Sequence, residues 1–215
     1  MKIFLDTADV AAVQKAQATG LIDGVTTNPA KIAESGRKFK DVVKEICSVT
    51  PGPVSAEAMS ETADALVQEA QQIASIAPNV VVKLPMTVEG LTAAGILERE
   101  KDVRVNVTMV FSAAQAHLAM KAGASYVSIV LSRLDAVANE SDILVRDTAA
   151  IKRNYGFESE IIAGSLKTTN HILSCLRAGI DIATVPDTLF FQMFLHPLTD
   201  AGLAGFAKVW QKVPK

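Results

Sequence analysis

One lysine in this 215-residue chain stands alone among apolar residues, and it is the side chain best suited to do chemistry. Lys83 lies in the run VVVKLP at residues 80–85, which contains no other charge. If the run is a strand, alternation places Lys83 on the same face as Val81, and burial of that face lowers the pKa of a lysine. A neutral lysine amine is a nucleophile for carbonyl groups. The alternative interpretation is a buried structural lysine that pairs with Glu57 or Asp6.

Two carboxylates, Asp6 and Glu57, end other strand-like runs and can therefore face Lys83. Carboxylates near an imine-forming lysine can move the protons that carbon–carbon bond cleavage requires. Both residues could instead be structural and form ion pairs. Asp6 also precedes a predicted helix and could be its N-cap. Uncharged hydrogen-bonding groups, of the kind that bind sugar hydroxyls, stand at further strand ends: Asn28, Asn106 and Thr108. Their alternative role is structural. Ser128 is another polar residue at a strand end.

A possible anion site follows the last predicted strands. Arg133 comes after the sixth strand-like run, and Ser165 and Lys167 come after the seventh. In barrels of alternating strands and helices, the loops after the last strands commonly hold phosphate together with a helix N-terminus. The alternative is an ordinary surface arginine and lysine.

The elements that must position these residues alternate along the whole chain. Short apolar or β-branched runs predict eight buried strands, at residues 2–5, 24–27, 53–58, 80–84, 103–108, 125–130, 160–164 and 182–185. Segments with helical spacing lie between them, at residues 10–19, 62–77, 91–100, 112–122, 142–155 and 168–178. This alternation predicts parallel strands in a (β/α)₈ TIM barrel. An open doubly wound sheet is the competing architecture. A glycine-rich phosphate loop after the first strand would favour that sheet, but residues 6–9 read DTAD instead.

The chain shows no linker or low-complexity tract that would divide it. Residues 1–215 are therefore expected to form a single barrel domain, with a C-terminal helical tail at about residues 197–215. Gly123, Gly156 and Gly179 fall where helical patterns stop, as expected of C-terminal caps. The tail has an apolar face with Phe206 and Trp210, which would either cap the barrel or pack on a neighbouring subunit.

Composition limits the possible functions. Hydrophobic residues make up 49% of the chain and charged residues 20%, which excludes disorder. The net charge of −2 gives no basic surface for nucleic acid, and no apolar stretch approaches the ~18 residues of a membrane span. Cys47 and Cys175 lie in predicted helices and suit free thiols, so we expect a soluble, cytoplasmic protein without a signal peptide. The histidines show no metal-ligand spacing, and no metal site is predicted: His117, His171 and His196.

Several longer strings resemble the transaldolase family, specifically its short-chain branch, which includes the fructose-6-phosphate aldolases. They occur in the family's order over nearly the whole chain: FLDTAD (4–9), GVTTNPAKI (24–32), VSAE (54–57), VVKLPMTVEGL (81–91), NVTMVFSAAQA (106–116), AGASYVS (122–128) and HPLTDAGLAGF (196–206). TTNP and VVKLP at these spacings are specific signals.

The resemblance implies a Schiff-base lysine at Lys83 and no metal or cofactor. Asp6 would take the proton of the C4 hydroxyl as the C3–C4 bond of a ketose phosphate breaks, leaving a dihydroxyacetone unit on the lysine. Glu57 and Thr108 match the pair that holds the catalytic water. Other positions match residues that bind the dihydroxyacetone hydroxyls (Asn28, Asn106, Ser128) or the phosphate (Arg133, Ser165, Lys167). The family also implies a homo-oligomer, typically a decamer built from pentamers, whose C-terminal helix reaches a neighbour.

The chain departs from the family at two positions. Residues 128–133 read SIVLSR, so the chain has Val130 at a position that is aromatic in the family. In family members, a tyrosine at this position goes with free aldolase activity and a phenylalanine goes with transaldolase activity. Lys167 stands where transaldolases usually carry arginine, whereas Glu57 is typical of transaldolases. Three functions remain open. The first is transfer of dihydroxyacetone between sugar phosphates, to an acceptor such as glyceraldehyde 3-phosphate or erythrose 4-phosphate. The second is an aldolase that releases free dihydroxyacetone, or a transaldolase for another anionic sugar such as a sulfonated one. The third is a non-catalytic phosphosugar-binding barrel.

Overall fold

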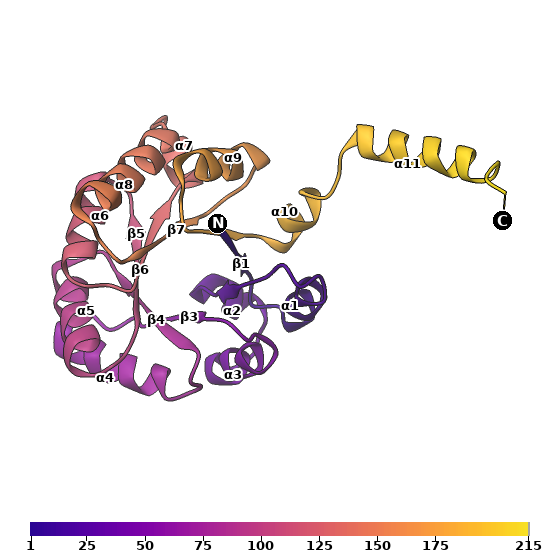
Figure 1. The fold of residues 1–215 in the computed structure, drawn as a ribbon. Coiled ribbons are helices and arrows are strands. Elements are labelled where there is room, and N and C mark those ends of the chain that lie inside the picture. Colours follow the sequence, from indigo (N-terminus) through magenta and orange to yellow (C-terminus); the bar gives the residue numbers. More distant parts are fainter. Residues whose placement is uncertain (215) are drawn as a thin grey trace.

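A closed barrel of eight parallel strands forms the centre of the computed structural model, which describes residues 1–214 (Figure 1). Each strand pairs with the next along the chain, and β8 pairs with β1. The predicted (β/α)₈ barrel is confirmed, and the open sheet is wrong because an open sheet leaves two unpaired edges. The strands are β1 Lys2–Asp6, β2 Gly24–Thr26, β3 Val54–Glu57, β4 Val80–Pro85, β5 Val105–Val110, β6 Tyr126–Val130, β7 Glu160–Gly164 and β8 Ile182–Val185.

The described residues form eleven helices, of which all but the last surround the barrel and pack apolar residues against the outside of the strands. They are α1 Val10–Gln17, α2 Pro29–Glu34, α3 Phe39–Val49, α4 Ala63–Ala74, α5 Val88–Glu100, α6 Ala113–Lys121, α7 Ser132–Asp135, α8 Ser141–Tyr155, α9 Thr169–Ala178, α10 Asp187–Gln192 and α11 Pro197–Trp210. The short helices α2, α7 and α10 were not predicted, because four to six residues are too few to show a helical period. The glycine stop signals are confirmed in part by α8 and α9, whose C-caps Gly156 and Gly179 are left-handed.

Two apolar layers fill the molecule. A large cluster lies between strands and helices, and a smaller one occupies the barrel interior: Phe4, Val81, Tyr126, Ile162 and Ile182. Cys175 is buried in α9, Cys47 is partly buried in α3, and both are free thiols. Among the described residues, no helix is both long and apolar enough to cross a bilayer.

One strand of the barrel is irregular close to its carboxyl end. The pairing of β5 with β6 shifts register between Val107 and Val110. Met109 has a φ of 63°, in the left-handed region. A bulge of this kind adds a residue and redirects the side chains around it. Thr108 and Met109, consecutive in sequence, therefore both line the cavity that the carboxyl ends of the strands surround.

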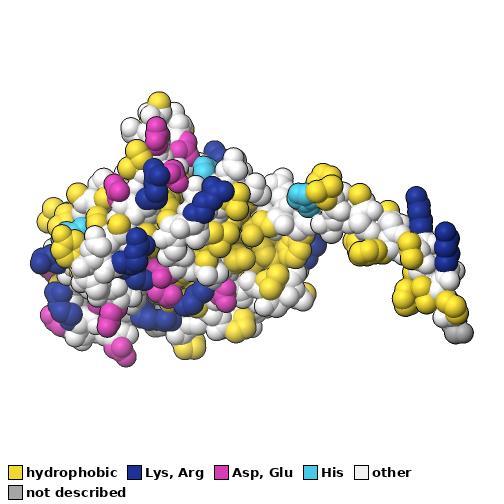
Figure 2. Space-filling view, turned by 45° about the horizontal axis from the view of Figure 1, so that its top comes forward, with side chains coloured by type: hydrophobic (Ala, Val, Ile, Leu, Met, Phe, Trp, Pro, Cys, Tyr) yellow, Lys and Arg dark blue, Asp and Glu magenta, His cyan; other side chains and the backbone are white. Residues whose placement is uncertain are grey.

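The C-terminal helix α11 projects from the barrel as an arm (Figure 1). None of its residues is buried, and its large apolar side chains are exposed (Figure 2). Phe206 and Trp210, for example, are 74% and 70% exposed. The predicted C-terminal helix is therefore confirmed, although it ends at Trp210 and residue 215 of the predicted tail lies outside the described residues. The alternative that this helix caps the barrel is wrong, because none of its residues is buried.

Candidate active site

A cavity of about 570 Å³ opens at the carboxyl ends of the strands, where barrels of this type carry their active sites. It collects polar side chains from seven of the strands, from Ser165 directly after the remaining strand, β7, and from the helices that follow the strands. Most of the predicted site residues line it: Asp6, Asn28, Glu57, Lys83, Thr108, Ser128, Arg133 and Ser165. Asn106 and Lys167 are the predicted residues that do not.

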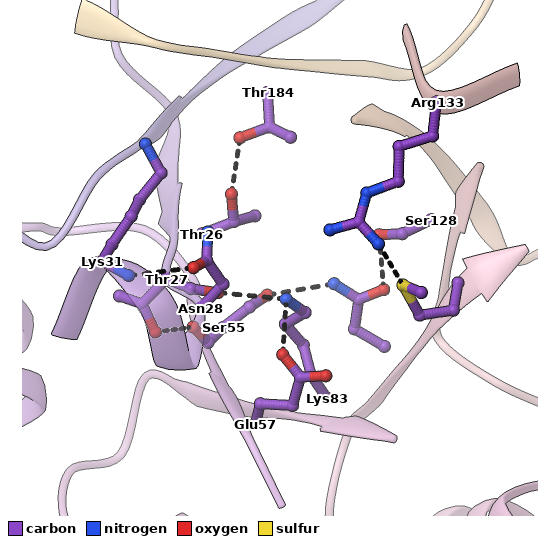
Figure 3. Close-up of polar contacts among 12 residues, drawn as sticks. Thr26, Thr27, Asn28, Lys31, Ser55, Glu57, Lys83, Ser128, Arg133 and Thr184 are labelled. Carbon is purple, nitrogen blue, oxygen red and sulfur yellow. Dashed lines mark hydrogen bonds and ion pairs between the residues drawn. The ribbon is translucent and has the colours of Figure 1, made fainter. Parts of the chain in front are cut away.

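Lys83 stands at the centre of this cavity (Figure 3). Strand β4 alternates as predicted, so Val81 lies in the barrel interior and Lys83 lies above it, with its side chain 10% exposed. Its Nζ donates to the main-chain oxygen of Thr27 at 3.0 Å and to Glu57 Oε2 at 3.2 Å. Glu57 is the register partner of Lys83 on β3, and its side chain is 15% exposed. The ion pair expected of a structural lysine is thus present, but the amine still faces the cavity.

Asp6 ends β1 and forms the opposite carboxylate of the site. Its side chain is 18% exposed, and burial raises the pKa of its carboxyl above the ordinary value. The positive charges of Lys31 and Lys83 oppose this shift, as does the Thr26 hydroxyl. Asp6 is not a helix cap, because Asp9 caps α1 by accepting from the main-chain N–H groups of its first turn. The Asp6 carboxylate is therefore free to face the cavity.

Below Lys83 a chain of hydrogen bonds forms the polar floor of the site. Asn106, the register partner of Lys83 on β5, is completely buried. Its amide nitrogen donates to Ser55 Oγ at 3.2 Å, and its amide oxygen accepts from Ser128 Oγ at 2.7 Å. Asn106 therefore lies under the cavity and orients Ser128, which does line it.

The end of β2 supplies a second group of polar contacts. Asn28 caps α2, because its Oδ1 accepts from the main-chain N–H of Lys31 at 3.0 Å. The adjacent Thr26 hydroxyl is hydrogen-bonded to Thr184 on β8 at 2.7 Å, and both threonines line the cavity. Asn28 thus has one amide oxygen engaged in the helix cap and keeps its NH₂ group for a ligand.

The predicted anion site is only partly assembled. Ser132 binds Ser165 twice, by an Oγ–Oγ hydrogen bond of 2.6 Å and by its main-chain N–H, and this holds Arg133 beside Ser165. Arg133 is exposed and contacts Met109 Sδ at 3.7 Å. The exposed Lys167 instead has its main-chain N–H directed to His171 Nδ1. The structure therefore brings Arg133 and Ser165 to the cavity, but not the Lys167 side chain.

Sequence reasoning missed two charged residues of the cavity wall, Lys31 and Glu34, together with Thr184, which pairs with the strand-end residue Thr26. Lys31 follows Asn28 by three residues, which is one helical turn, and this spacing could have indicated that both face the same side. Within residues 1–214, no cluster of three histidine, cysteine, aspartate or glutamate side chains is arranged to hold a metal ion.

Residues 3–214 match the family described as "Transaldolase/Fructose-6-phosphate aldolase". The chain belongs to the transaldolase/fructose-6-phosphate aldolase family. It is 48% identical to a "Probable transaldolase" of Geobacter metallireducens, over all of both chains. It is 49% identical to a "Probable transaldolase" of Caldicellulosiruptor saccharolyticus, over all of this chain and 99% of the relative. Family membership makes the protein an enzyme of the transaldolase/aldolase type.

Two solved structures share the barrel at much lower identity. A thiamine phosphate pyrophosphorylase from Pyrococcus furiosus matches with a TM-score of 0.59 and 15% identity. The match covers 86% of this chain and 85% of that chain. An inosine 5′-monophosphate dehydrogenase from Legionella pneumophila has a TM-score of 0.61 and 12% identity, over 88% and 58% of the two chains. At such low identity these matches concern the fold alone.

Proposed function

We propose that the protein is a transaldolase that carries a dihydroxyacetone unit as a Schiff base on Lys83. The observation that supports this proposal most directly is the position of Lys83: a largely buried amine at the centre of a polar cavity, between the carboxylates Asp6 and Glu57. The donor is a ketose phosphate such as fructose 6-phosphate or sedoheptulose 7-phosphate, and the acceptor is an aldose phosphate.

The chemistry begins when the neutral Lys83 amine attacks the C2 carbonyl of the donor and water leaves, giving an iminium. Asp6 then removes the proton of the C4 hydroxyl, and the C3–C4 bonding electrons move into the iminium, which becomes a neutral enamine. An aldehyde leaves, and a second aldehyde takes its place. Its carbonyl carbon bonds to the enamine carbon, Asp6 returns the proton, and hydrolysis of the new iminium frees the product. Glu57 and Thr108 both line the cavity, which supports the proposal that they hold the water of these steps.

The rest of the cavity fits a phosphorylated ketose. Asn28 and Ser128 offer hydrogen bonds to the dihydroxyacetone hydroxyls, and Asn106 supports them from below. Arg133 and Ser165 offer a charged and a neutral donor for the terminal phosphate. This phosphate is expected on the β6–β7 side of the cavity.

Transfer is favoured over release by the side chain at residue 130. Val130 lines the cavity and is 8% exposed, so it faces the reacting carbons. It has no hydroxyl that could order a water to protonate the enamine, and Glu57 is the residue typical of transaldolases at its position. The enamine is therefore expected to persist until an acceptor aldehyde arrives. Rapid release of free dihydroxyacetone would instead indicate an aldolase.

Borohydride trapping tests the imine directly. The protein is mixed with fructose 6-phosphate, reduced with borohydride, and mapped by peptide mass spectrometry. The expected adduct is on Lys83, and Lys83→Met should abolish both the adduct and the activity. An adduct on Lys31, the other lysine of the cavity wall, would overturn the mechanism. Analysis of products with and without glyceraldehyde 3-phosphate then separates transfer from release.

We also propose that α11 joins copies of this chain into a homo-oligomer, as the family resemblance implies. The support is its exposed apolar face, which includes Leu203, Phe206 and Trp210. An apolar face of this size is rarely left open in a monomer. Size-exclusion chromatography with light scattering measures the assembly.

A further inference from the structure

Lys31 is a charged side chain of the cavity wall that the proposed reaction leaves without a role. Its Nζ donates a hydrogen bond of 2.8 Å to the main-chain oxygen of Asp6 and lies 3.8 Å from Asp6 Oδ2. The side chain is 29% exposed. In Figure 3 it lies on the side of the cavity opposite Arg133. Lys31 therefore contacts the proposed base rather than the proposed phosphate site.

The groups that face the Asp6 carboxyl come from three neighbouring elements. Lys31 approaches from α2, Lys83 from β4 and the Thr26 hydroxyl from β2. Burial raises the pKa of Asp6, and of the three opposing groups Lys31 has the largest effect, ahead of Lys83 and Thr26.

The other acidic groups nearby have different neighbours. Glu57 is paired with Lys83 on the far side of the cavity. Glu34 lines the same cavity one turn after Lys31, and Asp187, at the start of α10, lines an adjoining cavity of about 700 Å³. The pKa shift of Asp6 comes from burial, Lys31, Lys83 and Thr26, so none of these carboxylates offsets the charge on Lys31.

Lys83 cannot supply that positive charge throughout the reaction. Its amine must be neutral when it attacks the carbonyl, and its nitrogen becomes neutral again when the iminium turns into the enamine. Lys31 takes no part in these bonds and keeps its ammonium through every step. It is therefore the one cation beside Asp6, among the described residues, whose charge is constant over the cycle.

We infer that Lys31 is a positioning residue of the proposed reaction, which holds the end of β1 in place and keeps the Asp6 carboxyl ionised until it takes the C4 hydroxyl proton. The inference rests on the proposed function and assigns Lys31 no contact with the reacting atoms. This role requires a positive charge on a long side chain. Arginine at residue 31 should therefore preserve part of the function of Lys31, and methionine should preserve none of it.

The test compares the pH dependence of kcat/KM for fructose 6-phosphate in the unmodified enzyme, Lys31→Met and Lys31→Arg. An opposite charge within 4–6 Å lowers a carboxyl pKa by about 1–3 units, and Lys31 is partly exposed, so the low end applies. In Lys31→Met the acidic limb of the profile should move up by about 1 pH unit, so that kcat/KM falls about tenfold on the acid side and much less on the alkaline side. Lys31→Arg should keep most of the original limb.

Two further measurements fix the interpretation. Lys44→Met, which removes an exposed lysine from the neighbouring helix α3, should leave the profile unchanged. Borohydride should still trap the substrate on Lys83 in Lys31→Met, since imine formation does not need Lys31. If the Lys31→Met profile coincides with that of the unmodified enzyme, or falls equally at every pH, the inference is wrong while the proposed function stands. If the unmodified protein forms no imine at all, both are wrong.

Discussion

Replacing Arg133 by alanine removes the charge that we expect to bind the phosphate of the donor. The guanidinium lies at the cavity beside Ser165, and its one side-chain hydrogen bond among the described residues is to the Met109 sulfur at 3.7 Å. No carboxylate of residues 1–214 forms an ion pair with it. The substitution therefore leaves no buried charge unpaired, and its effect measures the contact with substrate.

The size of the effect follows from the environment of Arg133. A hydrogen bond to a charged group contributes about 1.5–3 kcal/mol, and about 1.4 kcal/mol corresponds to a factor of ten in affinity. Because Arg133 is exposed and water competes for the phosphate, the low end applies. Arg133→Ala should raise the KM for fructose 6-phosphate about tenfold and change kcat less.

Steady-state kinetics with phosphorylated and unphosphorylated donors provide the assay. Fructose, which lacks the phosphate, should show nearly the same kcat/KM in Arg133→Ala as in the unmodified enzyme. Lys167→Ala is the matched control, because this lysine is exposed and outside the cavity wall. Its KM should change by less than about fivefold, which corresponds to the ~1 kcal/mol of an exposed charge pair. Equal losses for both donors in Arg133→Ala would show that the residue is structural, and a larger effect at Lys167 would refute the assignment.

Four further outcomes are expected. Val130→Tyr should increase the release of free dihydroxyacetone relative to transfer, measured by product analysis without an acceptor; an unchanged ratio would mean that a hydroxyl at this position does not control release. Asp6→Asn should raise the Tm at pH 7 by a few degrees: burial raises the native pKa of Asp6 above its unfolded value, so stability falls as the pH rises between the two. That advantage should shrink as the pH is lowered, because the raised pKa lets native Asp6 take up a proton before the unfolded chain does, and thermal unfolding over a pH series measures it. Burial raises the pKa of Cys47 to about 11 and that of Cys175 to about 12, so neither thiol should react with iodoacetamide at pH 8 until the protein unfolds. A chain that ends before α11 should keep its far-UV circular dichroism per residue but form smaller assemblies in light scattering, and an unchanged mass would exclude this helix from the interface.

The barrel was predictable because its strands are buried on both faces and its helices are amphipathic. Each strand is therefore a short apolar run, and a charge inside one of them, Lys83, is conspicuous. The same reasoning placed Asp6 and Glu57, at the ends of β1 and β3, around one cavity, since parallel strands bring their carboxyl ends together.

The sequence could not indicate which side chains reach the cavity, because this depends on side-chain length and on small irregularities of the backbone. Asn106 alternates as expected, but its burial below Lys83 depends on how deep its strand lies in the barrel. Lys31 reaches Asp6 only because α2 begins immediately after β2 and turns its first residues over the cavity. Lys167 fails to reach the cavity because Ser165, with a φ of 57°, changes the direction of the chain after β7.

The bulge in β5 gives the cavity a position that can change independently of the fold. Val107 and Val110, on either side of it, pack in the core between strands and helices. Met109 is the additional residue and is 37% exposed, so its side chain belongs to the cavity alone. Its left-handed backbone suits glycine or asparagine better than methionine. Replacing Met109 by glycine or asparagine can therefore reshape the pocket around a new substrate without straining the barrel, which makes this residue a natural starting point for the divergence or engineering of specificity.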